Sequence, residues 1–146
     1  MQKPFLVSIA IFLFLVSGCA NGIGNEEQKI EVQKRAGEDN KYEEFNEISD
    51  NERVQKVKEI LLDVDWEIAK VDMVSPAEYR FAFQFKNPDM EAKAVLYELW
   101  ISPNKDKVEI VIDAESKYTQ LNEEDSAVLF GIITGGKLSD LRSSSY

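Results

Sequence analysis

The strongest constraint on the fold is the stretch Tyr79–Lys86, in which aromatic residues occupy every second position. A period of two is typical of a β-strand that buries one face. Turn-forming residues follow at 87–89 and again at 103–106. Connections this short join antiparallel strands. The middle of the chain therefore predicts an antiparallel sheet.

Further elements flank this strand on both sides. Apolar residues recur at helical spacing, which predicts amphipathic helices over 49–63 and 122–134. Alternating or partly alternating patterns predict further strands at 66–73, 92–102, 108–113 and, as a short piece, 117–121. The predicted fold is α+β: an N-terminal helix, an antiparallel sheet of four or five strands in meander order, and a C-terminal helix packed on one sheet face.

The ends of both helices carry recognisable signals. Ser49 and Glu52 are spaced as a capping box, which makes Ser49 the predicted N-cap of the first helix. Gly135 and Gly136 follow the second helix, where glycine commonly ends a helix.

The start of the chain combines a positive charge, an apolar run and the only cysteine. Lys3 precedes Phe5–Val16, which is apolar except for Ser8. This run is shorter than the ~20 residues that a membrane-spanning helix needs, and its length suits the apolar region of a secretion signal. Cys19 follows shortly after it.

The residues Val16-Ser17-Gly18-Cys19 resemble the lipobox of bacterial lipoproteins, and the chain as a whole looks like a small lipoprotein of a Gram-positive bacterium. The resemblance implies a diacylglyceryl thioether on Cys19 and cleavage between Gly18 and Cys19. It leaves open whether the new amino group also carries an acyl chain such as palmitate. Two acyl chains would anchor the protein stably at the outer, extracytoplasmic side of the cell membrane. The alternative is an incidental cysteine after a cleaved or retained N-terminal helix.

Composition narrows the function classes. The chain has 17 basic and 27 acidic residues, and loss of residues 1–18 would remove one basic residue, Lys3, and no acid, which leaves 128 residues with a net charge of −11. Such a charge disfavours nucleic acid as a partner. The chain contains no histidine and no second cysteine, which excludes Ser-His-Asp and Cys-His catalysis, histidine-bearing zinc sites and a thiol redox pair. We expect no cofactor and no metal.

The segments outside the predicted domain are polar. Residues 19–48 are dense in charged and amide side chains and predict a flexible tether behind the lipidated Cys19, although Tyr42, Phe45 and Ile48 could dock on the domain. The domain itself is expected over 49–136. Residues 137–146 are Ser-rich and predict a disordered tail.

Two local motifs have ordinary structural explanations. Gly131–Leu138 matches part of a phosphate-binding loop, but Leu138 stands where that loop needs a hydroxyl, and the glycines end a helix instead of starting one. The acids of Asp63–Asp65 and Glu123–Asp125 lack the glycine of a calcium loop and are expected to serve the helix ends. A carboxylate pair for glycoside-type hydrolysis is left open.

The outward face of the predicted sheet offers the main candidate site. If the aromatic stripe of Tyr79–Lys86 faces the helices, Leu96, Trp100 and Val111 lie on the opposite face. Exposed apolar patches often mark contacts, and tryptophan is a favoured binding anchor. The alternative is that the stems of lysine and arginine side chains, or the linker before the domain, cover Trp100.

These observations favour a lipid-anchored module that binds a protein or envelope component and performs no chemistry. A carboxylate-dependent envelope hydrolase and a small-ligand-binding lipoprotein are the alternatives. The expected partners are the membrane, which the protein contacts through the lipid on Cys19, and a protein or envelope component that the sequence does not identify. The oligomeric state is open.

Overall fold

The computed structural model describes residues 27–90 and 94–143. The predicted signal segment and the lipobox-like stretch with Gly18 and Cys19 lie outside the described residues. The elements follow in the order β1 Gln28–Arg35, β2 Tyr42–Ile48, α2 Asn51–Asp63, β3 Glu67–Ile68, β4 Tyr79–Phe85, β5 Tyr97–Ile101, β6 Val108–Ile112, η1 Asp113–Glu115, β7 Lys117–Gln120, α3 Glu123–Thr134 and α4 Asp140–Ser143.

The described strands form one seven-stranded antiparallel sheet in the order β2-β1-β4-β5-β6-β7-β3. Two strands therefore precede the first described helix, and β1 lies inside the sheet between β2 and β4. The prediction of four or five strands in meander order, opened by a helix, is wrong. It missed β1 and β2, which were assigned to the tether.

β1 and β2 form strands although they contain few apolar residues, because two or three apolar side chains are enough to cover the core-facing side of a short strand. Ile30 and Val32 point into the core and are 0% and 2% exposed, while Glu31 between them points to solvent. In β2 the buried residue is Ile48. A tether over 28–48 is therefore excluded, and the folded domain begins about twenty residues earlier than predicted.

Both long helices were predicted correctly in position. Helix α2 begins after Asp50, whose side chain accepts a hydrogen bond from the Glu52 amide at 3.0 Å, so Asp50 and not Ser49 is the N-cap. Helix α3 is capped by Asn122, which accepts from the Asp125 amide at 2.7 Å. Gly135 ends it with φ of 77°, a left-handed conformation that glycine adopts without strain.

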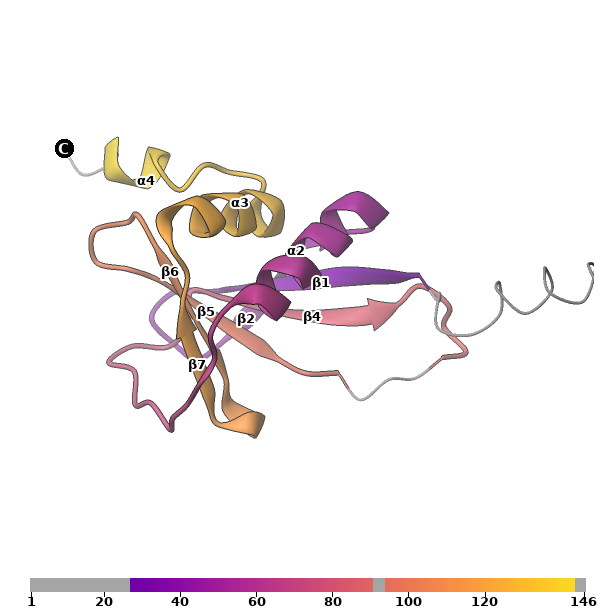
Figure 1. The fold of residues 1–146 in the computed structure, drawn as a ribbon, viewed down its shortest axis with the longest axis horizontal. Helices are drawn as coiled ribbons and strands as arrows, with labels where there is room; N and C mark the ends of the chain where they lie inside the picture. The colour runs from indigo at the N-terminus through magenta and orange to yellow at the C-terminus, as the bar shows by residue number, and fades with distance from the viewer. Residues whose placement is uncertain (1–26, 91–93, 144–146) are drawn as a thin grey trace, which may run out of the picture.

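Helices α2 and α3 cover the same face of the sheet, side by side (Figure 1). The core between them contains the aromatic stripe of β4, and Phe81 stacks on Tyr97 with ring centroids 5.0 Å apart. Tyr79 meets Phe130 of α3 edge to face. The opposite face, called the outer face below, carries the alternate residues of every strand.

The chain after α3 is part of the domain. Leu138 is 3% exposed and belongs to the core, and Leu141 of α4 packs against it. The prediction of a disordered tail over 137–146 is therefore wrong for 137–143. Leu138 and Leu141 pack on the core and order this otherwise polar segment. Residues 144–146 lie outside the described part.

Two strands are shorter than predicted. Only Glu67 and Ile68 of the predicted strand 66–73 pair with a neighbour, and β5 begins at Tyr97 within the predicted 92–102.

Within residues 27–90 and 94–143, none of the helices has the length and apolar character to cross a bilayer.

Candidate functional site: a groove on the outer face

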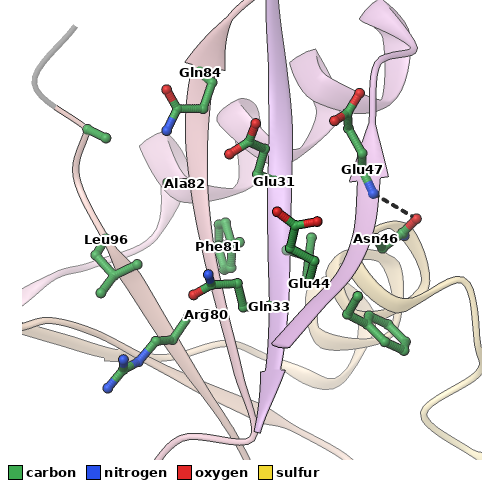
Figure 2. A pocket seen from close by; sticks show the side chains of 13 residues that line it. Glu31, Gln33, Glu44, Asn46, Glu47, Arg80, Phe81, Ala82, Gln84 and Leu96 are labelled. Atoms are coloured by element: carbon green, nitrogen blue, oxygen red, sulfur yellow. Dashed lines mark hydrogen bonds between the residues drawn. The ribbon is translucent and has the colours of Figure 1, made fainter. Parts of the chain in front are cut away.

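A hollow of the described surface lies on the outer face, across β2, β1 and β4 (Figure 2). Its volume is about 520 Å³. We call it the outer groove, and it is lined by Glu31, Val32, Gln33, Glu44, Phe45, Asn46, Glu47, Arg80, Phe81, Ala82, Gln84, Ala94 and Leu96. Three glutamates stand toward the β2 side and three apolar residues, Ala82, Ala94 and Leu96, toward the β5 side.

Strand register places the polar side chains of the groove. Glu31 pairs with Glu47 across β1 and β2, and Gln33 pairs with Glu44. Between these pairs the register shifts, because β2 holds one extra residue, Phe45, as a bulge. Alternation along each strand sends Glu31 and Gln33 to the outer face while Val32 enters the core.

One lysine partly neutralises the acidic side. The Lys29 ammonium lies 3.2 Å from a carboxylate oxygen of Glu31 and 3.3 Å from one of Glu47. Hydrogen bonds to these two carboxylates raise the pKa of Lys29. No ion pair or hydrogen bond within the described residues reaches the side chain of Glu44.

Arg80 closes one end of the groove. Its guanidinium stacks on the Tyr42 ring, 3.7 Å from the ring centroid, and its Nε lies 3.5 Å from a carboxylate oxygen of Glu98. The Tyr42 hydroxyl in turn donates to the Ala77 carbonyl at 2.7 Å. The stack and the ion pair hold Arg80 against the sheet, so this end of the groove is preformed.

The predicted interaction face is divided by the structure. Leu96 is 42% exposed and lines the outer groove, whereas Trp100 is 8% and Val111 6% exposed. The loop between β3 and β4 folds over both of them through Met73 and Ala77. Trp100 and Val111 form a second small core and are not available to a partner. Trp100 is covered, as the alternative expected, but the cover is the β3–β4 loop and not lysine and arginine stems or the linker.

Polar contacts fasten this covering loop. The Trp100 indole Nε1 donates to the Ser75 carbonyl at 2.8 Å, and Arg35 donates to the Pro76 carbonyl at 2.8 Å. Glu78 accepts from the Ile101 amide at 3.2 Å, and burial raises the pKa of its carboxyl. Glu78 and its neighbour Glu109 are thus held in structural contacts and do not face the groove.

The other motifs have structural roles. The glycines of Gly131–Leu138 end α3, and Glu123–Asp125 occupy its first turn. Asp63 is the last residue of α2, and the Asp65 carbonyl accepts from Thr119 at 3.1 Å. Within residues 27–90 and 94–143, no three acidic side chains gather as metal ligands would.

The polar residues of the groove were missed because their strands were assigned to the tether. The signal that could have found them is the alternation of Ile30 and Val32 with charged residues in β1. Arg80 and Gln84 were predicted to be on a strand, but their common neighbourhood with Glu31 depends on the pairing of β1 with β4.

Comparisons with known proteins give one family and one fold relative. A family model described as "YhfM protein" matches residues 23–138. No curated protein matches. Among solved structures, a thioesterase-like protein from Clostridium sporogenes is 15% identical with a TM-score of 0.51, over 74% of this chain and 94% of that one. At this identity the likeness concerns the fold alone.

Proposed function

This chain belongs to the YhfM protein family, and we propose that it is a lipid-anchored binding module on the outer side of the cell membrane. The observation that carries the proposal is the outer groove, an open hollow of mixed polar and apolar lining on the sheet face that the helices leave uncovered. The lipobox-like Val16-Ser17-Gly18-Cys19 supports the anchor.

The character of the groove favours a partner surface over a small apolar ligand. Ligands of the latter kind are held in largely enclosed, apolar pockets. The outer groove is open and offers carboxylate oxygens from Glu31 and Glu44 beside amide groups from Gln33 and Gln84. These groups accept hydrogen bonds from donor-rich partners, and Leu96 adds an apolar contact at the edge.

Site-specific crosslinking in cells tests the groove. A photoreactive amino acid is placed at Gln33, in the groove, or at Gln55, an exposed glutamine of α2 on the far side. We expect several-fold more of one discrete adduct from position 33, and loss of that adduct when Glu44→Lys reverses a groove charge. Equal yields from both positions, or an adduct indifferent to Glu44→Lys, would contradict the proposal.

Fractionation tests the anchor. We expect Cys19→Ala to leave the protein unlipidated and to release it from the membrane, because thioether formation needs the thiol. Ser17→Ala keeps a small residue at the position and is the matched control. Retention of the Cys19→Ala variant with no change in mass would contradict lipidation.

A carboxylate-dependent hydrolase is the second candidate, because the fold is similar to that of a thioesterase-like protein. In the groove Lys29 engages Glu31 and Glu47, which leaves Glu44 as the carboxylate most available to activate water. We expect no hydrolysis of an acyl thioester by the purified protein. Turnover that disappears in Glu44→Gln, with folding unchanged, would favour the hydrolase.

A further inference from the structure

The point where the chain enters the domain is fixed. The Glu27 carbonyl accepts from the Lys86 amide at 3.0 Å, which extends the pairing of β1 with β4 by one residue. The Glu27 carboxylate accepts from Asn51 at 3.1 Å and from the Lys86 ammonium at 3.3 Å, and these hydrogen bonds lower the pKa of Glu27. Residue 27 is thus tied to the end of β4 and the start of α2.

The length of chain before this point limits how far the domain can lie from the anchor. Cys19 and Glu27 are eight residues apart. Even fully extended, such a segment reaches no more than ~29 Å. The bound holds for any conformation of the segment, and it is much shorter than the reach of a tether that ended near Ser49.

The two central strands lead from this entry point to the opposite end of the sheet. From Phe85, the partner of Gln28, β4 runs to Tyr79, which pairs with Leu99 of β5. β5 then leads on to the turn 103–106, so that the path along the two strands is roughly 33 Å. Figure 1 shows the start of β1 and the β5–β6 turn at opposite ends of the longest axis.

We propose that the entry end of the domain, formed by Glu27, Lys86, Asn87, Pro88 and Met90, faces the lipid bilayer, with the turn 103–106 farthest from it. The proposal rests on lipidation of Cys19 and goes beyond it by assigning an orientation. Pro88 and Met90 are exposed there, Met90 by 37%, and would meet the lipid headgroups first.

The orientation also places the outer groove. A second hollow of about 370 Å³ lies at the entry end, between Lys29 and Met90, and shares Glu31 and Gln84 with the outer groove. The two hollows are thus neighbours along β1 and β4, and in this orientation the second one lies on the bilayer side. A partner held in the outer groove would therefore be bound close to the headgroups, beside the membrane.

Fluorescence quenching on vesicles tests the orientation. Cys19 is the only cysteine, and lipidation consumes its thiol, so an introduced cysteine is the single labelling site. Asp89→Cys at the entry end and Asn104→Cys at the distal turn are exposed turn positions and form a matched pair. The lipidated proteins are labelled and inserted into phosphatidylglycerol vesicles that contain a lipid with a nitroxide headgroup.

We expect the label at position 89 to be quenched several-fold more strongly than the label at 104. Similar quenching at the two positions, or the reverse order, in protein that floats with the vesicles would overturn the orientation alone. Protein that carries no lipid and does not float would overturn the anchor, and the orientation with it. Matching thermal midpoints show that both variants fold.

A variant with a longer connection between Cys19 and the domain tests whether the short connection sets the orientation. Insertion of twenty Gly and Ser residues after Gly24 leaves the domain unchanged and removes the limit on reach. We expect the quenching at position 89 to fall toward that at 104. A difference that survives the insertion would overturn the inference that the short connection sets the orientation.

Discussion

Leu96 and Trp100 show how one loop decides which apolar residue is available to a partner. Both point to the outer face, four residues apart, yet Leu96 is 42% exposed and Trp100 8%. The difference is the β3–β4 loop, whose Ser75 carbonyl accepts from the Trp100 indole. The alternation of β5 predicts the shared face correctly. The cover cannot be predicted, because the loop has no periodicity and meets Trp100 only in the tertiary fold.

Truncation of Trp100 should therefore unfold the protein more readily. We expect Trp100→Ala to lower the free energy of unfolding by about 3–5 kcal/mol, as for other buried aromatic residues. Leu96→Ala, the matched change at an exposed position, should stay within about 0.5 kcal/mol. Urea denaturation measures both, and a Trp100→Ala variant as stable as Leu96→Ala would refute the buried assignment.

Tyr118 makes the stability of the domain depend on pH in the alkaline range. Burial and a hydrogen bond to Glu109 raise the pKa of its phenol to about 12. An unfolded chain loses this proton at a pKa of about 10. The raised value means that the stabilisation by the neutral phenol is complete below pH ~10 and is lost as pH rises toward ~12.

The corresponding measurement is a titration of tyrosinate absorbance. The difference between the native protein and Tyr118→Phe should show one phenol that titrates near pH 12. The stability difference between the two proteins should shrink over the same range. A difference curve centred near pH 10 would show that the contact with Glu109 does not hold in solution.

At the scale of elements, helix α2 offers a direct choice between two caps. Asp50 accepts from the Glu52 amide, while Ser49 caps nothing in the structure. We expect Asp50→Ala to cost about 1 kcal/mol of unfolding free energy, typical of a lost N-cap, and Ser49→Ala to cost a few tenths at most. Thermal denaturation of the two variants decides, and the opposite ranking would restore the capping box at Ser49.

The elements that could be predicted are those with strong local patterns. The aromatic alternation of β4 and the helical spacing in α2 and α3 each need no knowledge of the rest of the fold. β1 and β2 could not be recognised in this way, because most of their side chains face solvent and are charged. The bulge at Phe45 also breaks the alternation of β2, which hides its buried face. The outer groove could not be predicted either, because β1 and β2 supply many of its residues.

At the scale of the whole molecule, stable folding of the domain requires both β1 and β2 and the segment 137–143 after α3. A fragment 27–143 should unfold cooperatively, whereas a fragment 49–136 should not, because it lacks Ile30 and Val32 of β1 and Leu138, all nearly fully buried. Circular dichroism melting curves compare the two. A cooperative transition in fragment 49–136 at a similar temperature would show that β1 and β2 are accessory.

The position of β1 inside the sheet has a mechanical consequence if Cys19 carries the lipid anchor that we propose. Any drag on the domain would reach it through the residues before Gln28, and hence through β1. An edge strand could be peeled away by breaking one set of backbone hydrogen bonds, but β1 is bonded to β2 on one side and β4 on the other. The domain would therefore resist extraction by its own tether, and force applied at the membrane would meet one of its firmest strands first.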